Sequence, residues 1–151
     1  PVKVKTMYSK VNYEYIIPTS SNDDMHKVVP FSLAKYLKDC GYNGAVNAFY
    51  DAAGRRWSTI FHADFNNEKV DYYEQPECSS PTYQEVVDFF RENLGIVIVV
   101  DAFFEDGEVM YTAKVIESND GKTFSGNLVS DEYYNALCNG IWTAIDIIIK
   151  T

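Results

Sequence analysis

Two Asp-Gly pairs, at 106–107 and 120–121, constrain the fold of this 151-residue chain more than any other feature. Each lies between runs of apolar or alternating residues, and Asp-Gly is among the strongest short signals for a tight hairpin turn, because glycine tolerates the positive φ that such turns require. The runs before, between and after the pairs read IVIVVDAFF, EVMYTAKVIES and KTFSGNLV. Residues 96–129 are therefore predicted to form a three-stranded antiparallel meander.

Helices are predicted on both sides of this meander. Thr82 and Glu85 form a T-x-x-E capping box, which is followed by a stripe of apolar residues and closed by Gly95, so we expect a helix over 82–94. Ser130 is a suitable N-cap for a last helix, whose apolar residues repeat at helical spacing. The second half of the chain is thus expected to have the order α-β-β-β-α.

The first half predicts further elements of the same kind. VNYEYII at 11–17 alternates as a strand does, PFSLAKYLKDC at 30–40 has helical spacing, and DAAG at 51–54 suits a turn between two short strands. Residues 62–81 show no clean period and contain two prolines, which predicts a long irregular loop. Together these elements predict one α+β domain over 1–151, an antiparallel sheet with packed helices, in which 1–27 supply an N-terminal strand and loop.

Composition and charge exclude several classes of protein. No apolar run approaches the roughly 18 residues that a membrane-spanning helix needs. The net charge is −9, and residues 79–151 carry 4 basic against 12 acidic side chains, so this half repels nucleic acid and anionic membranes. We therefore expect neither nucleic-acid nor membrane binding, although α-β-β-β-α is also the order of the double-stranded RNA-binding domain. The three cysteines are odd in number and widely spaced, which favours a reducing cytoplasm.

Sequence motifs for common cofactors are absent. The chain has no Walker loop, no G-x-G-x-x-G and no G-x-S-x-G, so no cofactor is expected. One set of residues, His62, Asp64 and Cys78, offers the ligand types of a transition-metal site or of a thiol nucleophile. Their spacing matches no metal motif, and we expect a surface histidine and an ordinary cysteine instead.

The carboxylates around the first Asp-Gly pair are a second candidate for chemistry. Asp101 ends an apolar strand, and Glu105 and Asp106 follow it. Catalytic carboxylates often occupy strand ends in open parallel sheets, but a strand that turns back after a tight turn is antiparallel, so that rule loses its force here. Alternation places Asp101 on the face opposite Ile96 and Ile98, toward solvent. We expect the polar rim of a hairpin and no catalytic or metal site.

Aromatic side chains supply the candidate binding residues. Tyr72 and Tyr73 lie in the irregular loop, and Trp57 lies at the first hairpin. Tyrosine offers a large contact area at little cost in conformational entropy and is enriched at protein interfaces. With Glu105 and Asp106, these residues are predicted to form an acidic, tyrosine-rich surface that binds a protein.

Two segments resemble a known group of proteins. VPFSLAKYLKDCGYNGAVNAFYDAAGRRWS contains A-x-x-L-K before G-[FY], and SPTYQEVVDFFRENLGIVIVV contains a Pro-Thr cap and V-x-x-[WF]-[FL]-R-E before a strand. Over residues 28–150 the chain resembles small uncharacterised proteins encoded by phages and prophages of gut bacteria. That group has no established activity, so the resemblance implies no catalytic residue. It implies expression in the cytoplasm of a host cell during infection, or packaging in a virion.

The function predicted from these observations is that of a non-enzymatic, phage-type accessory protein that binds a host or phage protein, with mimicry of nucleic acid as one form. Two alternatives stay open. One is a small metal-dependent hydrolase or nuclease that uses His62, Asp64 and acidic loop residues, with Asp101 as a further candidate. The other is a minor virion or assembly component, a homo-oligomer built on the isoleucine-rich last helix.

Overall fold

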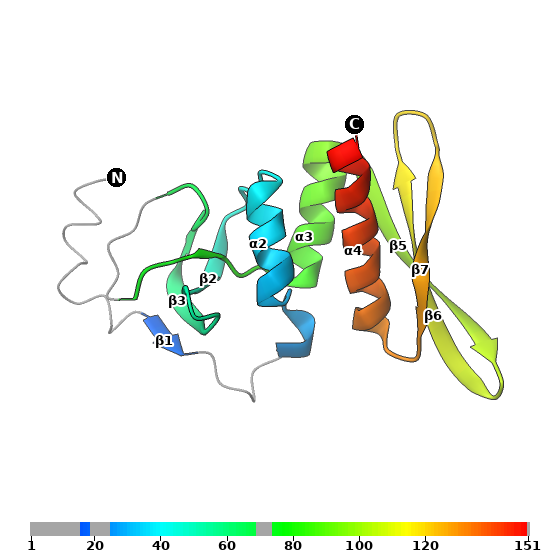
Figure 1. Ribbon diagram of the computed structural model, residues 1–151, viewed down its shortest axis with the longest axis horizontal. Coiled ribbons are helices and arrows are strands. Elements are labelled where there is room, and N and C mark those ends of the chain that lie inside the picture. Colours follow the sequence, from blue (N-terminus) through cyan, green and yellow to red (C-terminus); the bar gives the residue numbers. More distant parts are fainter. Residues whose placement is uncertain (1–15, 19–24, 69–73, 151) are drawn as a thin grey trace. The chain divides into compact units, whose positions relative to one another are not determined.

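The computed structural model describes residues 16–18, 25–68 and 74–150 (Figure 1). The chain falls into two compact units, Pro1–Pro81 and Thr82–Thr151, each with its own sheet. Both sheets are antiparallel and both units contain helices, so the α+β class is confirmed. The expectation of a single domain stays a prediction.

In its described residues, the first unit consists of a four-stranded sheet and one α-helix. Its strand order is β1-β3-β2-β4, and the expected hairpin is confirmed, because β2 and β3 are antiparallel neighbours. β1 overlaps the end of the strand predicted at 11–17, whose residues 11–15 lie outside the described part. The elements are β1 (Ile16–Pro18), the 3-10 turn η2 (Met25–Lys27), α2 (Phe31–Asp39), β2 (Val46–Tyr50), β3 (Arg56–Ala63) and β4 (Cys78–Ser79).

The core of this unit is built from one face of α2 and from aromatic residues of the sheet. Leu33, Ala34 and Leu37 recur at helical spacing and are almost fully buried, which confirms the predicted helix. Phe49 of β2 is also fully buried, and its ring packs against Phe65 with 5.3 Å between the centroids. Burial of side chains of this size contributes about 1.5–3 kcal/mol each.

The second unit has the predicted order α-β-β-β-α (Figure 1). Its three strands lie in the order β5-β6-β7, and α4 packs along all three. The predicted meander and the two flanking helices are therefore confirmed. The elements are α3 (Tyr83–Phe89), the π-helical turn η3 (Phe90–Leu94), β5 (Ile96–Glu105), β6 (Glu108–Glu117), β7 (Thr123–Ser130) and α4 (Tyr133–Lys150).

Close packing of α4 on the sheet depends on Gly140. A Cβ atom at this position would lie 2.8 Å from Cβ of Ala113 and 2.9 Å from Cγ2 of Ile98, closer than carbon atoms pack. The absence of a side chain thus lets the helix backbone approach β5 and β6. The side chains at this interface are nearly inaccessible to water, namely Ile98, Ala113, Val115, Ile141, Ala144 and Ile145.

The helix predicted at 82–94 is α-helical only as far as Phe89. Phe90–Leu94 forms a π turn, because Gly95, in the left-handed conformation with a φ of 65°, donates its N–H to the carbonyl of Phe90, five residues earlier. Leu94 lies in this turn and is exposed, although it belongs to the predicted apolar stripe.

Replacement of Thr82 by alanine tests the capping box. The Thr82 hydroxyl accepts the N–H of Glu85 at 3.1 Å, and the Glu85 carboxylate accepts the N–H of Thr82 at 2.8 Å. Because alanine leaves a helix N–H without its partner, we expect the free energy of unfolding to fall by about 1 kcal/mol, measured by urea denaturation. Thr82→Ser keeps the hydroxyl and serves as the control. An equal loss in both variants would contradict the role of the cap.

Candidate functional site

The β5–β6 hairpin is longer than the strand beside it. β5 and β6 pair along their whole length of ten residues, whereas β7 reaches along β6 only to Tyr111. Most of residues 101–110, which we call the arm, therefore extends as two strands beyond the three-stranded part of the sheet. Figure 1 shows the arm running past the loop that joins β7 to α4.

A two-residue turn closes the arm. Asp106 and Gly107 have positive φ angles of 51° and 82°, the signs of a type I′ turn, whose twist matches that of an antiparallel pair. Asp106 is the one non-glycine residue with positive φ in the described ranges, and aspartate tolerates this conformation better than most residues. The predicted Asp-Gly turn is confirmed. It presents Glu105, Asp106 and Glu108 together at the tip.

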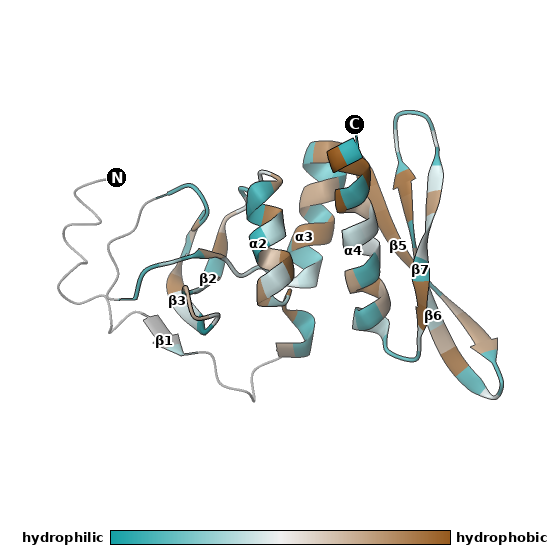
Figure 2. Ribbon diagram, in the orientation of Figure 1, coloured by the Kyte–Doolittle hydropathy of each residue, from teal (hydrophilic) through white to brown (hydrophobic). Residues whose placement is uncertain are grey.

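Apolar side chains of the arm face water on both sides. Phe104 is 68% exposed, Val109 opposite it is 49% exposed, and Phe103 on the other face is 36% exposed. Single exposed apolar residues are normal, but these are neighbours on a protruding pair of strands. Figure 2 shows apolar positions continuing along β5 and β6 into the arm, up to a polar turn. The arm therefore carries apolar surface that the rest of the second unit leaves uncovered.

A row of tyrosines continues from the base of the arm onto the helices. Tyr111 of β6 meets Tyr133 edge to face with 5.7 Å between ring centroids, and Tyr133 meets Tyr134 at 5.1 Å. Tyr134 in turn stacks on Tyr83 at 5.5 Å. Such pairs contribute about 0.5–1.5 kcal/mol each beyond the burial of area. Tyr133 is nevertheless exposed, so the row reaches the surface beside the arm.

The charge of the arm is entirely negative. Glu105, Asp106 and Glu108 are exposed, and the sequence has no lysine, arginine or histidine from 92 to 113. Ion pairs between described residues do not involve these three carboxylates. The structure therefore brings the candidates Glu105 and Asp106 together and adds Glu108 to them.

Asp101 lies at the base of the arm, where alternation predicted it. It is exposed on the face opposite Ile96 and Ile98, which are each 6% exposed. Its carboxylate forms an ion pair with the ammonium group of Lys114 on the neighbouring strand, at 3.2 Å. Because both side chains are partly exposed, this pair contributes little to stability.

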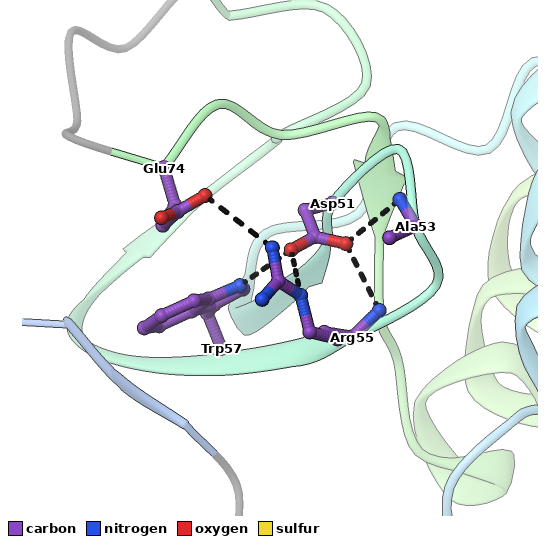
Figure 3. A network of polar contacts seen from close by, with 5 residues as sticks. All are labelled: Asp51, Ala53, Arg55, Trp57 and Glu74. Carbon is purple, nitrogen blue, oxygen red and sulfur yellow. Dashed lines mark hydrogen bonds and ion pairs between the residues drawn. The ribbon is translucent and has the colours of Figure 1, made fainter.

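The predicted binding residue Trp57 belongs to a polar network around Asp51 (Figure 3). Oδ1 of the buried Asp51 carboxylate accepts the backbone N–H groups of Ala53 and Arg55 at 2.9 and 3.0 Å. Oδ2 accepts Nε–H of Arg55 at 2.9 Å and the indole N–H of Trp57 at 3.0 Å. The Arg55 guanidinium also lies 4.0 Å from Glu74. The indole N–H of Trp57 thus helps to hold the β2–β3 turn.

The Asp51 carboxyl keeps its charge despite burial. Burial raises its pKa, but the N–H groups of Trp57, Arg55 and Ala53 and the positive charge of Arg55 outweigh that effect. The pKa of Asp51 therefore lies below its ordinary value of 3.8. At neutral pH the group is an anion that satisfies four donors around one turn.

The residues considered for a metal site do not gather. Among the described residues, no three histidine, cysteine, aspartate or glutamate side chains are placed to hold a metal ion. His62 is exposed on β3, and the Asp64 carboxylate accepts the backbone N–H of Asn66 and the side-chain amide of Asn67. Burial raises the pKa of the Cys78 thiol to about 12, so the thiol is protonated at neutral pH and is a poor nucleophile.

Part of this site was predicted from the sequence. Tyr72 and Tyr73 lie outside the described residues, so their binding role stays a prediction. Phe104, Val109 and Tyr133 were not predicted as binding residues. The available signal for the first two was their place one residue before Glu105 and one residue after Glu108, which flank the two-residue turn.

Comparison of the chain with protein-family models, with curated proteins and with solved structures found no match. None of the helices in the described ranges is long and apolar enough to cross a membrane. The contacts and exposure of the chain's own residues therefore carry the functional argument.

Replacement of Asp51 by asparagine tests the network in Figure 3. The variant keeps the size of the side chain but points an NH₂ donor at the N–H groups of Arg55 and Trp57, so we expect the free energy of unfolding at neutral pH to fall by about 2–3 kcal/mol. Because the pKa of Asp51 is lowered on folding, its stabilisation is complete above 3.8 and is lost as the pH falls through the folded value. The difference between wild type and variant should shrink in acid, measured by urea denaturation across pH. A difference independent of pH would contradict this account.

Proposed function

We propose that this protein is a non-enzymatic binding protein that acts on another protein through the arm. The proposal rests on one observation, a protruding pair of strands with apolar side chains exposed on both faces, Phe104 most of all. Covering a phenylalanine side chain contributes about 1.5–3 kcal/mol, and aromatic side chains are enriched at protein interfaces. A partner that covers the arm therefore gains binding free energy from surface that folding leaves in water.

The charge of the arm indicates the chemistry of that partner. The three carboxylates at the tip lie in a segment without basic residues. Complementary charge across an interface speeds association and rejects partners of like charge. We therefore expect the partner to present basic residues around an apolar site. Mimicry of nucleic acid, with carboxylates in the place of phosphates at a basic groove, is one form of this interaction.

The resemblance to small phage and prophage proteins suggests where the protein acts. In that setting the protein acts as an accessory factor on a host or phage protein, in the cytoplasm of the host cell or in the virion. The excess of carboxylates in the second half of the chain is consistent with a protein partner and opposes direct binding to nucleic acid.

A minor virion or assembly component is the second candidate, and the end of α4 favours it. Ile149 in the last turn is an exposed large apolar side chain, which can pack against a second copy. Asp146, one turn earlier, is also exposed and limits the apolar area of this face. For this role we expect a symmetric oligomer in light scattering that becomes monomeric in Ile149→Asp. No observation among the described residues favours a metal-dependent hydrolase or nuclease.

A photoreactive phenylalanine analogue at position 104 tests the proposed binding function. In extracts of cells that naturally produce the protein, illumination should link the arm to a predominant partner, which mass spectrometry identifies. The double variant Glu105→Lys with Glu108→Lys should reduce the yield of this product, because it reverses the charge at the tip and leaves the turn residues Asp106 and Gly107 in place.

The matched control places the same analogue at position 60. Ile60 is 68% exposed, as Phe104 is, but lies on β3 of the first unit. We expect a crosslinked partner from position 104 and none from position 60. Equal yields of the same products from both positions, or no product from position 104, would sink the proposal.

A further inference from the structure

We infer that the arm binds its partner by strand addition, in which an extended basic segment of the partner pairs with the free edge of β5. The inference rests on the proposed function and specifies it, since it names both the edge used and the chemistry of the bound segment. β5 lies at one side of its sheet, and in the described part of the chain β6 is its one neighbouring strand.

The pairing of β5 with β6 shows which backbone groups face the free edge. Ser118 donates its N–H to the carbonyl of Gly95 at 2.9 Å, so these two residues form a hydrogen-bonded pair in line with the β5–β6 register. Hydrogen-bonded pairs recur at every second residue of an antiparallel ladder. Odd-numbered residues of β5 therefore bond to β6. The N–H and C=O groups of even-numbered residues, Ala102 and Phe104 among them, point to the free edge.

Apart from the carboxylates of Asp101 and Glu105, this edge lacks the features by which edge strands usually avoid pairing. Residues 96–105 contain no proline and no lysine, and their register with β6 is continuous. The other edge of the sheet differs, because the register between β7 and β6 shifts between Thr112 and Lys114. A bulge of this kind interrupts the row of backbone groups that an added strand needs. Of the two edges, β5 is the better template.

Side chains beside the free edge define the segment that fits it. Asp101, Phe103 and Glu105 lie on one face of β5, while Ala102 and Phe104 lie on the other. Residues directly opposite each other in an antiparallel pair share a face, and opposite charges there are favourable. The bound segment should therefore carry basic residues two places either side of an apolar one, in the pattern basic-x-apolar-x-basic.

A second copy of the chain is a poorer occupant of the same edge. Asp101 and Glu105 share one face, so any antiparallel self-pairing through residues 101–105 sets one of these carboxylates directly opposite or diagonal to a carboxylate of the other copy. Like charges in these positions destabilise a pair of strands. The same two carboxylates attract a basic strand. Charge thus selects a partner different from the protein itself.

Fluorescence anisotropy with a defined peptide tests the inference. The probe is a labelled peptide that contains Lys-Thr-Val-Thr-Lys, and its control replaces both lysines with glutamate. Ala102→Pro removes an N–H at the free edge without removing a bond to β6, and proline is tolerated on edge strands. We expect this variant to bind the probe about tenfold more weakly than wild type, a loss of the size of one or two hydrogen bonds. Ala102→Thr keeps the N–H and should bind as wild type does.

A second measurement does not depend on the folding of the proline variant. The same peptide, methylated at its two threonine nitrogens, lacks the donors that would face Ala102 and Phe104 in an antiparallel pair. Wild-type protein should bind the methylated peptide at least about tenfold more weakly than the unmethylated one. Circular dichroism and the unfolding midpoint show whether Ala102→Pro is folded.

The outcomes separate this inference from the proposed function. Strand addition is overturned if wild type does not bind the probe, or if both Ala102→Pro and backbone methylation leave binding unchanged. The proposed function survives either result if crosslinking from position 104 still identifies an arm-dependent partner. The proposed function fails if crosslinking from position 104 gives no such partner, whether or not the peptide binds.

Discussion

The two-residue turn at Asp106 and Gly107 is the constraint on which the second unit depends. With this turn in place, Glu105 pairs with Glu108, and every later pair of β5 and β6 follows from that one. A slip by one residue would turn Ile98 away from α4 and expose it to water. The same register decides which backbone groups bond to β6 and which face the free edge. The positive φ angles of Asp106 and Gly107 thus determine both which side chains enter the core and which backbone groups face the free edge.

The end of this hairpin protrudes as an arm because β5 and β6 extend beyond the part of β6 that pairs with β7. Helix α4 approaches the sheet where Gly140 meets Ile98 and Ala113, and β7 covers β6 only to Tyr111. Burial consequently falls along a single strand, from nearly complete at Ile98 to slight at Phe104. The apolar character of β5 changes far less along the same path. One continuous strand therefore acts as core at its first half and as surface at its second.

Short sequence patterns predicted most of the fold but little of the candidate binding site. The capping box at Thr82 and the Asp-Gly turn each depend on a few neighbouring residues, and both were predicted. The exposure of Phe104 depends on where α4 and β7 stop, which is a tertiary property that alternation does not contain. The role of Trp57 was missed for a related reason, because its indole N–H is held by Asp51, six residues earlier and across a turn. The carboxylates of the tip were found because charge near a turn is exposed in almost any packing.

Asp101 and Glu105 have one further consequence, for the solubility of the chain. A regular, apolar strand edge is the usual starting point of aggregation, since identical strands stack on one another through their unpaired backbone groups. Charged residues within such a strand act as gatekeepers against that stacking. In β5 the gatekeepers stand on the edge strand itself and not on the residues that flank it. Neutralising them would therefore weaken the binding of a basic strand and also lower the barrier to amyloid-like assembly.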